Sequence, residues 1–293
     1  MRLATSTNLL FLRPDKSRLP LIDTMQRLAG AGFRILDLNF YDWSLPGSPF
    51  LTDNWEGWIE EIICKKEELG LEFKQCHGYF YSFLSLSMSE EEREYHNMLQ
   101  MRSFECLHRL GAQIVVLHPE TVPDTVSYVK KSYEANKRYF DMVLENTSKY
   151  GFLIAVENMC DYSIAPKRKF CAYPDELADF ISGFGSKRMG ICWDFEHADI
   201  MEQDQKESLY IIKEYLLATH VSDTYSKTDN TLMHVLPMTG TINWKEVVGT
   251  LHEINYTGDF CFEVHNYLNK LPDEVVDTGL KLAYEIGMHL LRS

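Results

Sequence analysis

Residues that can bind a metal ion or transfer a proton recur along this 293-residue chain, each at the end of a short apolar run. They are spaced 40, 41, 39, 37, 26 and 43 residues apart. Burying several unpaired carboxylates together without a cation is very costly, so the series points to one shared metal-binding or proton-transfer site. The series is Asp37, His77, His118, Glu157, Asp194, His220 and Glu263.

The last four members, Glu157, Asp194, His220 and Glu263, form the tightest subset. Three carboxylates and one imidazole make a hard, mostly oxygen donor set that suits one divalent ion of Mn, Mg, Co or Zn. His197 follows Asp194 by three residues, a spacing that can return it to the same site as a substrate contact or an extra ligand. Its alternative role is that of a residue in the first turn of a helix.

Eight apolar runs predict strands, and amphipathic stretches between them predict helices. Ser89 and Glu92 predict a capping box at one helix start. Apolar stripes predict two further helices, one from Val126, Val129, Tyr133, Phe140 and Val143, the other from Val276, Leu280, Ala283, Gly287 and Leu290. The predicted strands are Arg2–Thr5, Arg34–Leu38, Glu72–Cys76, Gln113–Leu117, Leu153–Val156, Met189–Trp193, Ala218–Val221 and Phe260–Val264.

Strict alternation of strand and helix implies parallel strands joined by crossovers. Eight such units predict an α/β fold of the (β/α)8 TIM barrel type, with residues 1–293 as a single domain. The rival, a doubly wound open sheet, would show a glycine-rich loop after the first strand, and Thr5–Phe11 has no glycine. A barrel carries its chemistry at the carboxyl ends of its strands, where the series above lies.

Composition narrows the class of partner. The net charge of −14 disfavours nucleic acid, because phosphate binding depends on Lys and Arg. No apolar run approaches the roughly 20 residues that cross a bilayer, and the polar N-terminal segment is not expected to act as a signal peptide. Seven scattered cysteines, with no Cys-x-x-Cys pair, predict reduced thiols in a cytoplasmic protein. We expect a small-molecule substrate and allow for a homo-oligomer.

Five motifs in order resemble the sugar isomerase/epimerase branch of the xylose-isomerase-like TIM barrels, the superfamily that also contains endonuclease IV. Each motif lies on or just after a predicted strand in the C-terminal half, and the strand count extends the resemblance to the whole chain. The motifs are Val156-Glu157-Asn158, Trp193-Asp194-Phe195-Glu196-His197, His220-Val221-Ser222-Asp223, Gly240-Thr241-Ile242-Asn243-Trp244 and Phe262-Glu263.

The resemblance implies that Glu157, Asp194, His220 and Glu263 hold one divalent metal and that His197 contacts substrate. It also implies that Glu157 and Glu263 are the acid/base pair of a sugar isomerase or epimerase working through a metal-stabilised enediolate. Further candidate substrate contacts are His77, His118 and His234. Epimerases often carry a second glutamate where this chain has Ser163, so their substrate specificity does not transfer.

Two other reactions remain open. A lyase of the inosose-dehydratase type would use the same metal and the same enolate chemistry. A phosphodiesterase of the endonuclease IV kind would use three metals held by a set that adds His77, His118, His197 and His234, but this chain has Leu232 where that family has an aspartate.

Weaker signals surround the proposed site. The run Lys167-Arg168-Lys169 is either an anion contact or a solvated loop, and His265 is placed to reach the mouth. Four aromatic residues form either an apolar wall against a sugar ring or ordinary packing: Trp43, Tyr79, Phe80 and Phe195.

Overall fold

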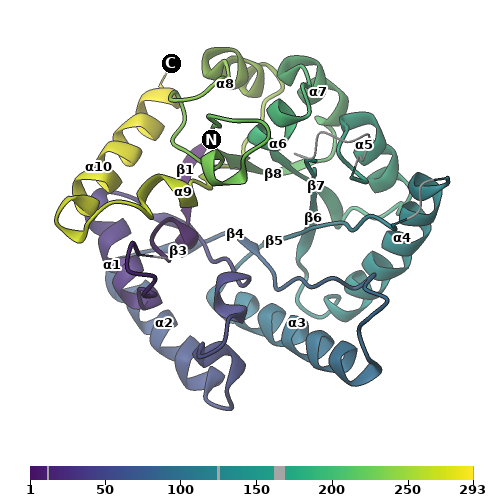
Figure 1. The fold of residues 1–293 in the computed structure, drawn as a ribbon, viewed down its shortest axis with the longest axis horizontal. Helices are drawn as coiled ribbons and strands as arrows, with labels where there is room; N and C mark the ends of the chain where they lie inside the picture. The colour runs from purple at the N-terminus through teal and green to yellow at the C-terminus, as the bar shows by residue number, and fades with distance from the viewer. Residues whose placement is uncertain (12, 124–125, 162–168, 293) are drawn as a thin grey trace.

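A ring of parallel strands surrounded by helices forms the protein (Figure 1). The computed structural model describes residues 1–11, 13–123, 126–161 and 169–292. This architecture confirms the predicted α/β barrel in a single domain. All the strand pairs within the sheet are parallel, as expected when every connection is a helical crossover.

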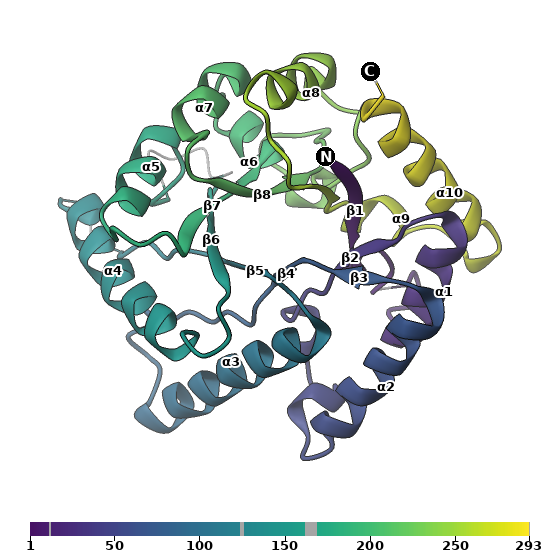
Figure 2. The same ribbon diagram turned by 180° about the vertical axis from the view of Figure 1, so that it is seen from behind.

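Each of the eight predicted strands is present, and the third is interrupted at Lys74 into β3 and β4. Along the sheet the order is β3-β2-β1-β9-β8-β7-β6-β5-β4, so its two ends are the halves of that one strand (Figure 2). The ring therefore closes, and the sheet formed by the described strands has no free edge. The strands are β1 (Arg2–Ser6), β2 (Ile35–Asp37), β3 (Glu72–Phe73), β4 (Gln75–His77), β5 (Ile114–Leu117), β6 (Leu153–Glu157), β7 (Met189–Asp194), β8 (Leu216–Val221) and β9 (Asp259–Phe262).

Helices form the outer ring, and short 3-10 turns occur in the loops. Among the described residues, no helix is both long enough and apolar enough to cross a membrane. The helices are α1 (Leu21–Ala31), α2 (Trp55–Leu69), α3 (Glu90–Leu110), α4 (Tyr128–Asn146), α5 (Pro174–Ser182), α6 (Phe195–Ile200), α7 (Gln205–Ile212), α8 (Trp244–Glu253), α9 (His265–Leu268) and α10 (Asp273–Leu290). The 3-10 turns are η1 (Thr7–Leu10), η2 (Asp42–Ser44), η3 (Pro49–Leu51) and η4 (Asn230–Leu232).

Two helix predictions are confirmed and one is partly wrong. The capping box of Ser89 and Glu92 opens α3, and the predicted stripe of α10 is buried along its whole length. In α4 the predicted stripe is misplaced at its start: Val126 precedes the helix and is 92% exposed. The helix buries Ser132 and Asn136 instead, because these side chains bind the backbone of residues 120–122.

Inside the ring, apolar side chains fill the barrel below its mouth. Two buried clusters contain the four residues Val116, Ala155, Cys192 and Ala218 and the three residues Ala4, Ile35 and Cys261. The larger apolar core lies between the strands and the helices. Because the barrel interior is packed, a ligand has access only at the mouth.

A bulge between β7 and β8 sets the pairing of two predicted metal ligands. Ile191 lies opposite Leu216, but Cys192 lies opposite Ala218, so Leu217 is the extra residue. This one-residue shift places Asp194 opposite His220. Gly190 fits here because a Cβ atom would collide with the Leu217 side chain and lie 2.6 Å from the carbonyl oxygen of Tyr215.

We therefore expect Gly190→Ala to lower the free energy of unfolding by about 1–3 kcal/mol, through overpacking at the bulge. Gly249→Ala is the matched control, because Gly249 lies exposed in α8 with open space around its Cα, and alanine there should raise stability by about 0.5–1 kcal/mol. Urea unfolding of both variants measures the difference. Equal stability of the two variants contradicts the role given to the bulge.

Candidate metal centre

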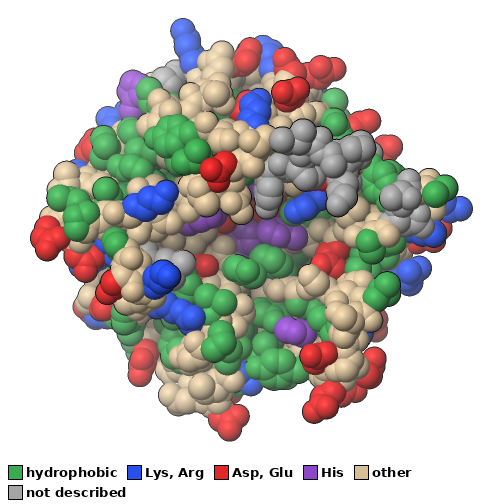
Figure 3. Space-filling view, viewed as in Figure 1, with side chains coloured by type: hydrophobic (Ala, Val, Ile, Leu, Met, Phe, Trp, Pro, Cys, Tyr) green, Lys and Arg blue, Asp and Glu red, His purple; other side chains and the backbone are tan. Residues whose placement is uncertain are grey.

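All seven residues of the predicted series meet at the carboxyl ends of the strands. Asp37, His77, Glu157 and Asp194 end β2, β4, β6 and β7, and His220 is the penultimate residue of β8. His118 and Glu263 follow β5 and β9 by one residue. They lie in or beneath a pocket of about 520 Å³ at the centre of this face, where histidine side chains line the hollow (Figure 3).

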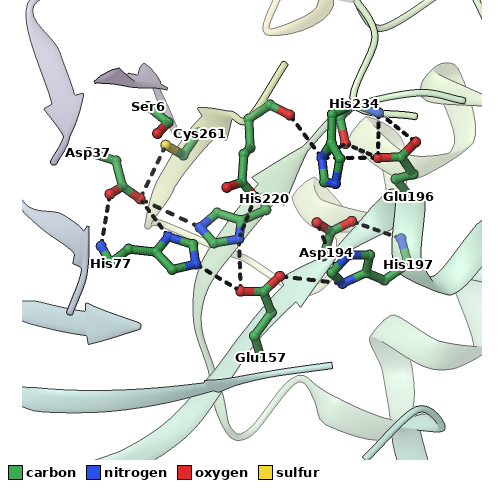
Figure 4. Close-up of polar contacts among 12 residues, drawn as sticks. Ser6, Asp37, His77, Glu157, Asp194, Glu196, His197, His220, His234 and Cys261 are labelled. Carbon is green, nitrogen blue, oxygen red and sulfur yellow. Dashed lines mark hydrogen bonds and ion pairs between the residues drawn. The ribbon is translucent and has the colours of Figure 1, made fainter. Parts of the chain in front are cut away.

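Four of these side chains form a compact buried group. One potential ligand atom from each of Glu157, Asp194, His220 and Glu263 lies within 4.8 Å of the others. Nδ1 of His220 is 3.3 Å from Oε2 of Glu157 (Figure 4). It is also 3.3 Å from Oε2 of Glu263. All four residues are buried, and they come from four consecutive strands.

Some polar atoms of this group have no hydrogen-bond partner among the described residues. Oδ2 of Asp194 and both ring nitrogens of His220 are buried without a hydrogen-bond partner there. Buried polar atoms normally have partners, and unpaired buried charges are costly. Carboxylate oxygens and an imidazole nitrogen that converge in this way suit a divalent cation, so the residues present fit a metal site.

Glu157 is also surrounded by imidazoles. Its Oε2 lies 3.2 Å from Nε2 of His77 and 3.0 Å from Nε2 of His118, and its Oε1 lies 3.3 Å from Nδ1 of His197. Burial raises the pKa of Glu157, but the His220 and His118 charges outweigh it and hold the pKa well below its usual value. Glu157, His77 and His118 also make a second group of close ligand atoms.

Asp37 organises two of these histidines from below. Its Oδ1 accepts the backbone N–H of His77 at 2.9 Å, and its Oδ2 is 3.5 Å from Nε2 of His220. The His77 and His220 rings stack with centroids 4.6 Å apart and planes 13° apart. Burial and His220 lower the pKa of His77, but Asp37 and Glu157 raise it to about 10. Asp37 thus turns the Nδ1 side of His220 towards Glu157 and Glu263.

The short helix α6 and the side-chain amide of Asn158 hold His197 and Asp194 in place. The Asp194 side chain caps α6 by accepting the backbone N–H of His197 at 2.8 Å. Asn158 joins the ends of β6 and β7, because its side chain bonds both the N–H and the carbonyl of Asp194. His197 lines the pocket, with Nδ1 2.8 Å from the carbonyl of Asn158.

Glu196 is a buried site residue that the sequence analysis did not assign. Its Oε2 is 3.1 Å from Nδ1 of His234 and accepts the Ser222 hydroxyl at 2.8 Å. Its two oxygens also accept the backbone N–H of His234. His234 therefore stands at the mouth beside His265, with ring centroids 4.2 Å apart, and the predicted reach of His265 to the mouth is confirmed. The signal was available, since Glu196 lies between Asp194 and His197.

Two of the sequence motifs, the one that ends at Asp223 and the one from Gly240 to Trp244, stabilise the loop after β8. Oxygens of the Asp223 carboxylate accept the backbone N–H of Met238 and Ile242 and the indole N–H of Trp244. A Cβ atom at Gly240 would collide with that carboxylate. The motif residues Asp223, Gly240 and Trp244 therefore position the loop that carries His234.

The structure decides between the two roles left open for the four aromatic residues. Phe80 lines the pocket, whereas Trp43, Tyr79 and Phe195 are buried in the apolar core. Tyr41, which was not predicted, stands beside Phe80 with centroids 5.1 Å apart. Of the basic run, Lys169 lines the pocket, and Lys167 and Arg168 lie outside the described residues, as does Ser163.

Fold and site together define a class: a (β/α)8 barrel with a buried carboxylate and imidazole cluster of metal-site type at its mouth. Residues 25–286 match the model of the xylose isomerase-like TIM barrel family. The chain belongs to this family.

The individual proteins that resemble this chain share low sequence identity with it. An uncharacterized protein of Methanocaldococcus jannaschii is 27% identical over 193 residues, which are 65% of this chain and 64% of that protein, so the match spans less than two thirds of the relative. A D-tagatose 3-epimerase-like protein has a TM-score of 0.74 at 20% identity, covering 100% of this chain and 98% of the other. D-psicose 3-epimerase, solved in the presence of D-fructose, has a TM-score of 0.74 at 14% identity over the full length of both chains.

We expect Asp37→Asn to weaken Mn²⁺ binding about 10- to 100-fold, because the amide no longer holds His220 with a charge-assisted contact. Competition with a fluorescent chelator measures the dissociation constant. Asp53→Asn, at an exposed aspartate before α2, is the matched control and should bind Mn²⁺ as the wild type does. A folded Asp37→Asn variant with wild-type Mn²⁺ affinity contradicts this role.

Proposed function

We propose that the protein is a divalent-metal-dependent isomerase or epimerase of a small sugar or sugar derivative. In this proposal Glu157, Asp194, His220 and Glu263 are the metal ligands. The observation that carries it is the convergence of these four buried side chains, with Oδ2 of Asp194 and both ring nitrogens of His220 left without hydrogen-bond partners among the described residues. Mn²⁺ is the ion we favour, and Mg²⁺, Co²⁺ and Zn²⁺ suit a related donor set.

A divalent cation bound there supplies Lewis-acid stabilisation of negative charge on a carbonyl oxygen. Glu157 and Glu263 are proposed as the acid/base pair that removes the adjacent C–H proton and returns it. Burial raises the pKa of Glu263, but His220 and His77 lower it to about 2, so its carboxylate is charged near neutrality. Asn8 donates to Oε1 of Glu263 at 3.1 Å and keeps the other oxygen towards His220.

The histidines at the mouth are proposed as substrate contacts. His77, His118, His197 and His234 line the same pocket as the two glutamates and offer ring nitrogens to sugar hydroxyls. Structural neighbours named as D-tagatose 3-epimerase-like protein and D-psicose 3-epimerase support a ketose-like substrate. A pocket rich in carboxylate and imidazole groups agrees with a polyhydroxylated molecule.

We expect Glu157→Gln and Glu263→Gln each to lower turnover at least about 100-fold, because the amide keeps the size of the side chain but cannot accept the proton. Mn²⁺ content must be measured on each variant, since both residues are proposed ligands. Glu67→Gln, at an exposed glutamate of α2, is the matched control and should keep full turnover. A variant that holds metal and turns over normally shows that its glutamate is not the acid or base.

The fate of the proton separates isomerase from lyase. Incubation of the Mn²⁺-loaded protein with ketoses in D₂O should place deuterium next to the carbonyl of an isomeric product, detected by NMR and mass spectrometry. A lyase would release water or another leaving group, and the product mass would fall.

The group of Glu157, His77 and His118 favours phosphodiester hydrolysis as a second candidate, because it could hold another ion. Against it, the chain carries a charge of −14. Cleavage of abasic DNA, with a strong salt dependence and no activity on any sugar, would replace our proposal.

A further inference from the structure

The pocket above the metal centre continues into a second lobe. Besides the central lobe of about 520 Å³, a neighbouring lobe of about 580 Å³ lies over the loops that follow β4 and β5. The two lobes share walls, among them Tyr41, Phe80, His118 and Met159. In Figure 3 the hollow runs across the face as a groove, with hydrophobic side chains along one bank. Each lobe is large enough for a small ligand, typical pockets being roughly 300–1,000 Å³.

A ladder of rings leads from the metal centre into this second lobe. Nε2 of His118 is 3.0 Å from Glu157, and the His118 ring lies 4.3 Å from the ring of Phe80. Phe80 then stacks on Tyr41 with centroids 5.1 Å apart and planes only 9° apart. Tyr41 remains 51% exposed, and its backbone N–H is fixed by the side chain of Asn39. The ladder therefore ends in a flat, open aromatic surface beside the groove.

The second lobe is also lined by a fixed carboxylate, that of Glu120. Oε2 of Glu120 accepts the backbone N–H of Leu84 at 2.6 Å. The fully buried Asn136 bonds both the N–H and the carbonyl of Glu120, which holds this residue in place. A carboxylate accepts hydrogen bonds from hydroxyl groups and repels phosphate, whereas an aromatic face packs against the apolar face of a ring. Lys169 lines both lobes as well, so the groove offers a hydrogen-bond donor besides the carboxylate acceptor. An aromatic face with a donor and an acceptor near it suits a sugar ring.

We propose that the second lobe binds a second sugar ring, so that the substrate is a disaccharide or related glycoside. Its reacting ring lies over the metal centre, and its second ring packs on Tyr41 with its hydroxyls towards Glu120. This proposal rests on the proposed function, because the first ring is the one that the metal centre would transform. It adds a substrate class that is larger than a free monosaccharide.

Isothermal titration calorimetry on the full chain loaded with Mn²⁺ tests the proposal. The probes are D-fructose, D-fructose 6-phosphate and four disaccharides with a fructose unit: lactulose, maltulose, isomaltulose and turanose. At least one disaccharide should bind ten times or more tighter than fructose. Tyr41→Ala should bring this affinity ratio close to one, and Tyr41→Phe should restore it, because the ring face is the contact. Tyr210→Ala, at an aromatic residue of α7 that is 44% exposed, should leave the ratio unchanged.

The outcomes separate the two proposals. If the protein binds and isomerises fructose but shows no preference for a disaccharide, the second-ring subsite is overturned and the proposed function stands. Tighter binding of fructose 6-phosphate than of every disaccharide, or a Tyr41→Ala variant that keeps the preference, also overturns the subsite. Absence of binding and conversion for every sugar overturns both.

Discussion

Buried negative charge at the barrel mouth is the constraint on which the rest of the structure depends. Asp37, Glu157, Asp194 and Glu263 are all nearly inaccessible, and they stand at the ends of neighbouring or nearby strands. Water cannot solvate them there, so the charge must be balanced by neighbouring groups, and the imidazoles that converge on these carboxylates, in an arrangement that suits a cation, are placed to do so. The dense set of histidines around Glu157 follows from this need, and so do the contacts that Asp37 makes with His77 and His220.

The scaffold fixes the donors before any ion or substrate arrives. The bulge after Gly190 sets Asp194 opposite His220, and Asn158 ties Asp194 to the end of β6. Asp223 fixes the loop that carries His234, because its carboxylate accepts the backbone N–H of Met238 and the indole N–H of Trp244. Such preorganisation matters because a ligand held by loose side chains would lose affinity to their ordering entropy.

The floor and the walls of the pocket have different consequences for function. The floor is built from strand ends, and its carboxylate and imidazole groups suit a divalent cation. The walls come from loops, where Tyr41, Phe80 and Glu120 line the second lobe. A barrel fold supports many reactions by changing such loops. The shared architecture with proteins named as epimerases, at 14–20% identity, therefore does not identify the substrate, which depends on the loop residues that line the pocket.

The sequence by itself determined the eight strands, the barrel and the series of strand-end ligands, because burial patterns and the spacing of β/α units are local properties. It also led to the interpretation of Glu157, Asp194, His220 and Glu263 as one set. The position of Glu196 between Asp194 and His197 is visible in the sequence, but only the tertiary structure revealed its role, because its partners Ser222 and His234 come from the loop after β8. The same holds for the Tyr41–Phe80 stack and for the extra residue Leu217, because contacts across loops and shifts in strand register depend on which surfaces meet after the ring closes.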